Sequence, residues 1–467
     1  MVVNSLNFLL FFVVVFIVYY LPVFRNNPKY QNGWLLLTSY YFYGIANWRM
    51  IPLLLGATII FFGIGRWLKV EMKRNNERRA SNITTLGVVL GVCLLLYFKY
   101  LNFFAESFAQ ILNAIGLNVS WTTLNIVLPI GVSFFTFKLI SYVIEIHREH
   151  IEPSSDFIEF GTYIAFFPTI LSGPIDRPNT FISQLGGVRT FKHDMAVDGC
   201  RQILWGMFTK MCIADNLVKV TDNAWDNMQE LSASYLFGAA LLYYIQMYAD
   251  FDGYSNMAIG VGKLLGIKIT RNFNHPLLAR NTAEYWRRWH ISLTSWITDY
   301  IFMPLNIAFR NYGNQGICLA CIINLVVIGL WHGANWTYAF FGLYHGFLFI
   351  PLVYSGIFGK NKKLKSHLYG LPKLGDFLKM AITFLLVSFG LVIFRAPSVD
   401  CFVAYIGCLG DTSLITSPHL GLELPVYIFI VIFPFIEWMT KTKEHALQNL
   451  SKFRIVRWLT WFISEFC

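Results

Sequence analysis

Long apolar stretches recur along this chain and constrain its fold more than any other feature. A helix that crosses a bilayer needs about 20 predominantly apolar residues. Stretches of roughly this kind lie at 5–23, 33–46, 50–67, 83–103, 124–145, 157–172, 201–219, 234–260, 316–331, 336–354, 377–394 and 422–439, with a short apolar tail at 457–467. Only 13% of the residues are charged, whereas soluble domains usually carry about 25%. The sequence therefore predicts an all-α, polytopic transmembrane protein of about 11–13 helices, in which the shorter helices are re-entrant.

Basic residues lie in short clusters between these stretches and indicate how the chain is oriented. The net charge of +11 would suggest nucleic-acid binding in a soluble protein. In a membrane protein, connections rich in Lys and Arg stay in the cytoplasm, so we expect no nucleic-acid partner. The connections expected in the cytoplasm are 66–79, 263–288, 360–379 and 441–457. The connections 105–122 and 221–233 contain no Lys or Arg, so these connections and the N-terminus are expected outside.

The stretches 316–331 and 336–354 are flanked on both sides by connections expected in the cytoplasm. They must therefore form a hairpin, and its turn carries His332 deep within the protein. An ionisable side chain at such depth is costly and is a functional candidate by default. Histidine takes up and returns a proton near neutral pH, so we interpret His332 as a general base rather than a structural histidine. The nearby His345 is interpreted as a buried structural histidine that donates to a backbone carbonyl.

Tryptophans and adjacent arginines mark a second polar segment, residues 284–296. One interpretation is an amphipathic helix in the membrane interface, anchored by aromatic and cationic side chains. The other is a binding site in which the arginines hold the phosphates of an acyl carrier, with a histidine near its entrance. The residues that these interpretations concern are Trp286, Arg287, Arg288, Trp289 and His290.

A polar insert at 246–256 interrupts another apolar stretch. Asp250 and Tyr254 share one helical face there, next to Ser255. Buried carboxylates of this kind either form ion pairs that tie helices together or line a wet cavity that binds substrate, and both interpretations stay open.

A glycine and two prolines end the helix before residue 178. The charged pair in this turn, Asp176 and Arg177, belongs either to a loop that binds the acyl carrier or to an ordinary cytoplasmic turn.

In this order, the segments resemble the membrane-bound O-acyltransferase (MBOAT) superfamily. The closest branch is bacterial and contains alginate O-acetyltransferases, peptidoglycan O-acetyltransferases and the D-alanyl transfer proteins of teichoic acid synthesis. The combination of W-R-R-W-H at 286–290 with L-W-H-G-A-N-W at 330–336 is the specific signature. The other matching pieces are 4–8, 172–178, 250–260, 273–276 and 389–396.

The resemblance implies an MBOAT-type funnel of helices and a single transmembrane domain over residues 1–467. It implies that His332, in the W-H-G motif, is catalytic and that His290 is the second family histidine. Trp331 and Asn335 flank His332 and are expected to bind substrate. The chain departs from the family pattern at Pro304-Leu305-Asn306-Ile307, and at Asp252 and Asn256 within the polar insert.

The resemblance also implies the reaction and its participants. Acetyl-CoA is the expected donor, a D-alanyl carrier protein is the alternative, and the acceptor is a polysaccharide or cell-wall hydroxyl outside the cell. A separate extracytoplasmic acyltransferase of the SGNH type is the expected partner, with membrane lipid around the chain. We expect the inner membrane of a bacterium, no permanently bound cofactor and no metal site, because the cysteine spacing indicates none.

Two functions of other classes remain open from the sequence. Polar residues at membrane depth also fit the permeation path of a transporter. Transporters commonly show internal repeats, however, and none is visible in this chain. A scaffold that assembles a partner enzyme without chemistry of its own is the second alternative.

Overall fold

The computed structural model describes residues 4–121, 123–124, 126–360 and 372–448, and within these ranges the chain is helical, without a β-strand. Among the described residues, five helical stretches are long and apolar enough to cross a membrane. They are Pro28–Lys73, Glu77–Ala114, Arg310–His332, Trp336–Tyr354 and Leu374–Arg395. Shorter apolar helices span Leu6–Tyr19, Val399–Cys408 and Leu424–Met439. The prediction of an all-α polytopic membrane protein is confirmed, while the predicted tail at 457–467 lies outside the described residues.

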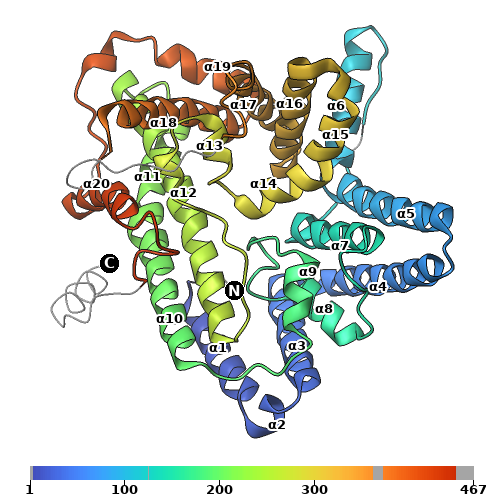
Figure 1. The fold of residues 1–467 in the computed structure, drawn as a ribbon. Coiled ribbons are helices and arrows are strands. Elements are labelled where there is room, and N and C mark those ends of the chain that lie inside the picture. The colour runs from blue at the N-terminus through green and yellow to red at the C-terminus, as the bar shows by residue number, and fades with distance from the viewer. Residues whose placement is uncertain (1–3, 122, 125, 361–371, 449–467) are drawn as a thin grey trace. The chain divides into compact units, whose positions relative to one another are not determined.

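The chain forms two compact units (Figure 1). The first comprises residues 1–200 and 258–270, and the second comprises 201–257 and 271–467. The helices that begin in the first unit are α1 (Leu6–Tyr19), α2 (Pro22–Arg25), α3 (Pro28–Asn47), α4 (Ile51–Lys73), α5 (Glu77–Leu95), α6 (Leu101–Ala114), α7 (Val132–His147), α8 (Phe157–Ala165), α9 (Pro178–Phe181) and α10 (His193–Phe208).

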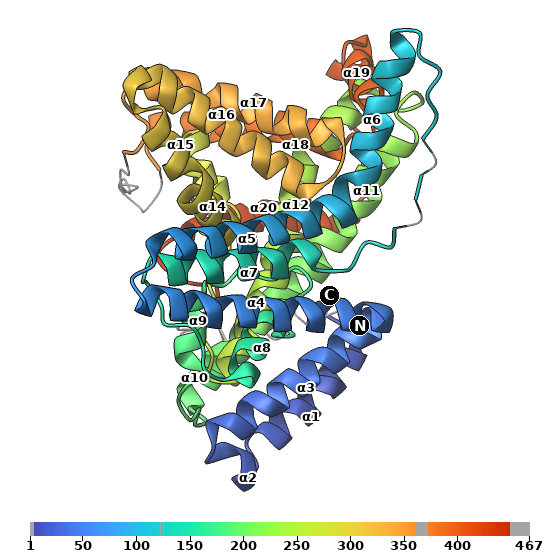
Figure 2. The same cartoon turned by 90° about the vertical axis from the view of Figure 1, so that its right-hand side faces the viewer.

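In the first unit, α7 packs against α4 and α5, and the three helices lie side by side in Figure 2. Small residues allow this close approach, because a Cβ on Gly91 of α5 would lie 2.5 Å from Cγ1 of Ile140 on α7. The predicted span at 157–172 is wrong as a continuous helix, since α8 ends at Ala165. Pro168 and Pro174 follow, and proline cannot continue the hydrogen-bonded ladder of a helix.

The second unit contains the remaining helices. They are α11 (Asp215–Asp226), the greater part of α12 (Ala233–Leu264), α13 (Thr282–Trp286), α14 (Ile291–Ile297), α15 (Met303–Ala308), α16 (Gly313–His332), α17 (Trp336–Tyr354), α18 (Leu374–Arg395), α19 (Val399–Cys408) and α20 (Leu424–Met439).

Helices α16 and α17 form the predicted hairpin and lie side by side in both views (Figures 1 and 2). Two glycines on facing surfaces allow the backbones to touch. A Cβ on Gly329 would lie 2.0 Å from the carbonyl oxygen of Tyr338, and one on Gly342 would lie 2.3 Å from that of Leu325. Such contacts leave no room for any side chain, so the hairpin depends on glycine at both positions.

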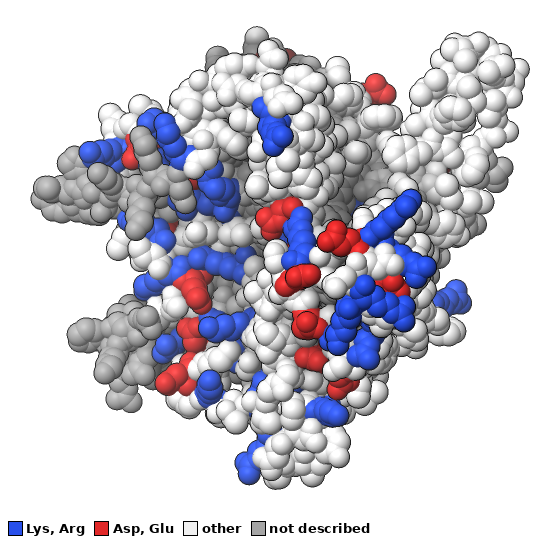
Figure 3. Space-filling view, turned by 45° about the vertical axis from the view of Figure 1, so that its right-hand side comes forward, with Lys and Arg blue, Asp and Glu red and all other residues white. Residues whose placement is uncertain are grey.

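Large apolar side chains on the surface fit a lipid environment. Many large apolar side chains are more than half exposed, among them Leu37, Ile382 and Val431. Exposure of so much apolar surface to water would be unfavourable. Figure 3 shows the charged side chains of one face gathered in limited areas, with wide uncharged areas between them. Such uncharged surface is suited to contact with lipid tails. This agrees with the membrane-spanning helices that the apolar stretches of the sequence predict.

Candidate functional site

His332 is the last residue of α16, at the turn of the hairpin. Its imidazole is partly exposed and meets two aromatic rings edge to face. The ring centroid lies 4.9 Å from that of Trp331 and 5.0 Å from that of Phe394 on α18. Two aromatic rings therefore flank an imidazole that keeps part of its surface accessible.

The turn after His332 is fixed by its own sequence. Asn335 caps α17, because its Oδ1 accepts a hydrogen bond from the backbone N–H of Thr337 at 3.1 Å. The Nδ2 of Asn335 donates to the carbonyl of Pro397 at 2.8 Å. A Cβ on Gly333 would lie 2.2 Å from the ring of Tyr338, so only glycine fits there. Asn335 therefore caps α17 and ties the turn to the connection between α18 and α19.

His290 reaches the same region from the connection between α13 and α14. Its side chain is 1% exposed, and neither ring nitrogen has a hydrogen-bond partner. The ring contacts Phe251 at a centroid distance of 4.7 Å and Trp331 at 5.7 Å. Burial lowers the pKa of His290 well below its ordinary value, and the neighbouring His332 lowers it further. His290 is therefore a neutral imidazole at physiological pH, suited to orient or polarise a bound group rather than to carry charge.

The backbone of His290 has φ 43°, in the left-handed region that few residues other than glycine adopt. Strained conformations of this kind cluster at functional sites, where the surrounding structure enforces them. No local pattern of residues signals this strain.

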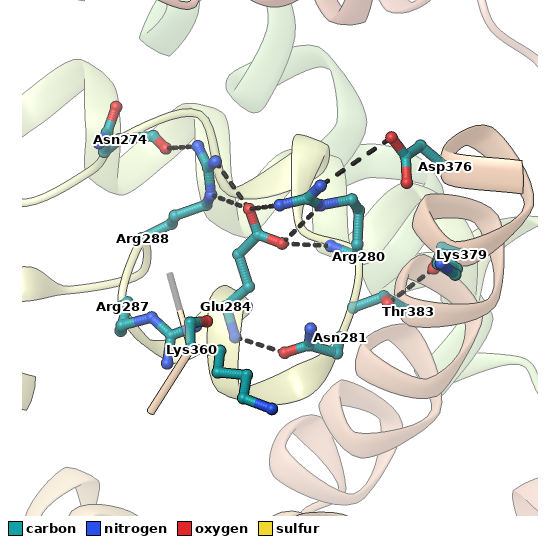
Figure 4. Close-up of polar contacts among 10 residues, drawn as sticks. All are labelled: Asn274, Arg280, Asn281, Glu284, Arg287, Arg288, Lys360, Asp376, Lys379 and Thr383. Atoms are coloured by element: carbon teal, nitrogen blue, oxygen red, sulfur yellow. Dashed lines mark hydrogen bonds and ion pairs between the residues drawn. The ribbon is translucent and has the colours of Figure 1, made fainter. Parts of the chain in front are cut away.

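Glu284 organises the cationic side of the site (Figure 4). Its carboxylate lies between Arg280 and Arg288, with Oε2 at 3.0 Å from Arg280 Nε and Oε1 at 2.8 Å from Arg288 Nη2. Burial acts to raise the pKa of Glu284, but the hydrogen bonds and charges of these two arginines hold it below its ordinary value. Arg288 also donates to the carbonyl of Asn274 at 2.9 Å. The guanidinium of Arg288 is thus paired with groups of the protein itself.

Arg287 is placed differently from its neighbour. Its side chain is exposed, and its Nη2 donates to the carbonyl of Lys360 at a long 3.4 Å. It borders a mostly apolar cavity of about 190 Å³. The cavity is lined by Ala283, Trp286, Arg287, Thr294, Thr298, Phe302, Cys321, Asn324, Leu325, Ile328, Phe349, Phe358 and Gly359. The structure thus separates the two arginines, and Arg287 is the one that faces open space.

Asn324 is the polar member of the α16 wall of this cavity. It is 8% exposed, and its Oδ1 has no hydrogen-bond partner. A buried amide usually finds partners, so an unpaired one in a cavity wall is a candidate ligand contact. Sequence reasoning missed this residue, although a lone asparagine within the apolar stretch 316–331 was a usable signal.

The tryptophans of the W-R-R-W-H motif are buried in the protein, with Trp286 4% and Trp289 7% exposed. Trp286 Nε1 donates to Nδ1 of His345 at 3.4 Å, and Trp289 stacks on Tyr285 with centroids 5.3 Å apart. Both tryptophans are therefore packed inside the protein. This differs from the interpretation of the segment as an interfacial helix whose aromatic side chains face outward. His345 is fully buried, as expected, but it accepts from an indole instead of donating to a carbonyl.

The polar insert of α12 separates into different roles. Asp250 pairs with Lys210 at 2.6 Å, and the same lysine pairs with Asp215 at 2.6 Å, so Asp250 belongs to a partly exposed ion-pair network that joins α12 to α11. Ser255 is buried and accepts from Asn272 Nδ2 at 3.1 Å. Tyr254 is half-buried on the same helix.

Asp176 and Arg177 lie in the first unit, whereas the other candidate residues lie in the second. Asp176 is 1% exposed, and its Oδ1 accepts from the backbone N–H of Thr270 at 2.8 Å. Arg177 is the residue before α9. Among the described residues, no cluster of three or more His, Cys, Asp or Glu side chains is suited to hold a metal ion.

Over most of its length, the chain is similar in sequence to known proteins. The sequence model of the MBOAT family, described as the membrane-bound O-acyltransferase family, matches residues 147–365. The probable alginate O-acetylase AlgI of Pseudomonas aeruginosa is 37% identical over 405 residues, which cover 86% of this chain and 73% of that protein. The peptidoglycan O-acetyltransferase of Helicobacter pylori is 29% identical over 461 residues, 90% and 83% of the two chains. The teichoic acid D-alanyltransferase of Streptococcus thermophilus is 32% identical over 282 residues, 56% and 65% of the two chains.

The apolar helices and these relatives define a class, the acyltransferases embedded in bacterial membranes. Within that class, the chain belongs to the membrane-bound O-acyltransferase family.

Proposed function

We propose that this protein transfers an acetyl group from a thioester donor at its cytoplasmic side to a hydroxyl acceptor outside, with His332 as general base. The observation that carries the proposal is the placement of a reachable imidazole and a buried neutral one on the same ring, that of Trp331. Two imidazoles with such different surroundings suit two different roles in one reaction.

In the proposed reaction, an imidazole nitrogen of His332 takes the proton of the acceptor hydroxyl. The oxygen attacks the thioester carbonyl, the carbon–sulfur bond breaks and an oxygen ester forms. The imidazolium then returns the proton to the departing thiolate. His290 orients the donor or polarises its carbonyl. Exclusion of water by the surrounding aromatic rings favours transfer over hydrolysis of the thioester.

The exposed guanidinium of Arg287 and the apolar cavity beside it suit the donor. An arginine pairs well with phosphate, and acetyl-CoA carries phosphates at one end and a thioester at the other. The relatives support acetyl, since those named as O-acetylases or O-acetyltransferases align over 85% or more of this chain in the cases of Pseudomonas aeruginosa and Helicobacter pylori. The D-alanyltransferase of Streptococcus thermophilus aligns over 56%, so a D-alanyl carrier protein is the alternative donor.

The acceptor in this proposal is a polysaccharide or cell-wall hydroxyl, in line with the names of the relatives. The acetyl group reaches it either directly or through an extracytoplasmic partner acyltransferase of the SGNH type. A transporter with no chemistry would need no base at the hairpin turn, so loss of turnover on removing His332 separates the two functions.

The test is turnover of labelled thioesters by the purified protein. We expect consumption of labelled acetyl-CoA by the wild type and loss of activity of about a hundred- to ten-thousand-fold in His332→Ala. The matched control is His193→Ala, which removes an exposed histidine at the start of α10. Equal turnover by His332→Ala and the wild type would refute the general base. Consumption of a D-alanyl carrier thioester in place of acetyl-CoA would refute the acetyl donor.

A further inference from the structure

A buried carboxylate on α20, Glu437, lies outside the proposed reaction. Its side chain is 4% exposed. Glu437 Oε2 accepts a hydrogen bond from Tyr248 Oη at 2.7 Å and lies 3.0 Å from Nδ1 of His275. Removing one partner of such a buried group is costly, because the other is left unpaired. Glu437 therefore ties α20 to α12 and to the connection that follows α12.

His275 forms a strained corner of that connection. It has φ 51° and ψ 61° and precedes Pro276. The left-handed region is unfavourable for a residue other than glycine, and a following proline restricts the backbone further. The imidazole Nε2 of His275 lies 3.4 Å from the carbonyl oxygen of Lys443. A corner of this kind keeps its shape only while its neighbours hold it, and Glu437 is its closest charged neighbour.

The residues just before this corner hold the backbone on both sides of His290. The N–H of Ile291 donates to the carbonyl of Asn272 at 2.7 Å, and the N–H of Asn274 donates to that of Arg288 at 3.0 Å. His290 itself has the left-handed φ of 43°. Its ring direction is therefore set by a segment whose far end is the corner at His275.

Side chains reinforce the same connection. Asn272 Oδ1 accepts from Ser292 Oγ at 2.6 Å, two residues beyond His290. The ring of Phe273 lies 5.0 Å from that of Trp289 and 5.4 Å from that of Tyr248, centroid to centroid. Tyr248 thus contacts both Glu437 and the ring of Phe273. The carboxylate of Glu437 therefore reaches the segment 272–275 by two routes, one through Tyr248 and one through His275.

We infer that Glu437 is a positioning residue for acyl transfer. Through His275 and Tyr248 it holds the segment 272–275, and that segment sets the direction of the His290 ring toward Trp331. The inference rests on the proposed function, because the direction of His290 matters only if this site performs the reaction. It assigns a role in the chemistry to α20, whose carboxylate is remote in sequence from both family histidines.

The first experiment compares Glu437→Ala, Glu437→Gln and the wild type in turnover of labelled acetyl-CoA. The kcat is expressed per donor-binding site, so that loss of folded protein does not count as loss of turnover. A misplacement of about 1 Å costs about a hundredfold in rate. We therefore expect Glu437→Ala to lose about tenfold to a hundredfold in kcat with the donor KM changed less than about twofold. Glu437→Gln, which retains an acceptor for Tyr248 but no charge beside His275, should fall between the two.

The matched control is Glu423→Gln, an exposed glutamate at the start of the same helix, which should leave kcat unchanged. The second experiment adds His275→Asn, since asparagine tolerates the left-handed backbone. If Glu437 acts through His275, the double variant of Glu437→Gln and His275→Asn loses no more kcat than the more damaging of the two single variants. Losses that multiply would overturn the inference.

His332→Ala in the same assay separates this inference from the proposed function. If the wild type is active, His332→Ala is inactive and Glu437→Ala keeps the wild-type kcat per site, the inference is wrong and the proposed function stands. If His332→Ala turns over thioester as fast as the wild type, the proposed function is wrong and the inference fails with it.

Discussion

The imidazole of His290 meets the indole of Trp331 edge to face, with centroids 5.7 Å apart and planes inclined by 78°. The same indole meets the ring of His332 at 4.9 Å and 82°. Two histidines from different motifs are therefore aligned on one aromatic side chain. Trp331 is 8% exposed, so this alignment lies in the interior of the second unit.

Replacing the indole of Trp331 with an aliphatic side chain tests this alignment. Trp331→Leu removes the aromatic surface on which both imidazoles rest, and we expect kcat to fall about tenfold or more because both rings lose their direction. The donor KM should change little, since Trp331 does not line the cavity beside Arg287. Trp48→Phe is the control, because Trp48 is 70% exposed. Wild-type kcat in Trp331→Leu would show that the shared indole is dispensable.

The adjacent arginines should give opposite phenotypes. Arg287→Gln removes an exposed charge, so we expect a donor KM about tenfold higher with unchanged thermal stability. Arg288→Gln breaks contacts with Glu284 and Asn274, so we expect a loss of stability of about 1–3 kcal/mol. Turnover as a function of donor concentration and thermal unfolding measure the two effects. The assignment fails if Arg288→Gln alone alters the donor KM.

Asn324 should act in binding rather than in folding. Asn324→Leu replaces an unpaired buried amide with an apolar group of similar shape, a change that is usually neutral or stabilising. We expect unchanged or higher thermal stability and a donor KM raised by about threefold to tenfold through loss of one hydrogen bond. Asn314→Leu, on the exposed start of the same helix, is the control. A fall in stability with unchanged KM would argue against a ligand contact.

The hairpin should tolerate no side chain at Gly342. Gly342→Ala would place Cβ 2.3 Å from the carbonyl oxygen of Leu325, so α16 and α17 must separate, at a cost of about 1–3 kcal/mol or more. Gly63→Ala on α4 has no atom within 4 Å of the new Cβ and should be neutral or stabilising by about 1 kcal/mol. Thermal unfolding in detergent compares the two, and equal stability would contradict the close packing.

Acid should destabilise the fold through His290. Its folded pKa lies well below the ordinary value, whereas an unfolded histidine titrates near about 6.5. Below that pH the unfolded state binds a proton that the folded state does not, so stability falls as pH falls, by up to about 1.4 kcal/mol per pH unit. Asparagine tolerates the left-handed backbone, so His290→Asn removes the titrating group without adding strain. This variant should show a smaller change of the free energy of unfolding between about pH 6.5 and pH 5. An unchanged slope would show that other groups cause the acid sensitivity.

Much of the fold follows from local features of the sequence. The hairpin of α16 and α17 was predictable because apolar stretches and the charges between them are read segment by segment. The short helix α8 was not, because Pro168 lies within a stretch whose composition still suits a span. Asn324 was missed although its position in an apolar stretch was visible, since one amide within a helix more often packs structurally.

The sequence by itself determined that this is a polytopic membrane protein and which histidines to examine, because hydropathy and motif spacing are properties of single segments. Only the tertiary structure decided that Arg287 is exposed while Arg288 is paired, that Trp286 is buried, and that Glu437 contacts His275. These outcomes depend on which distant segments meet and on the distances between their side chains. No local pattern encodes such distances, because packing of the whole unit sets them.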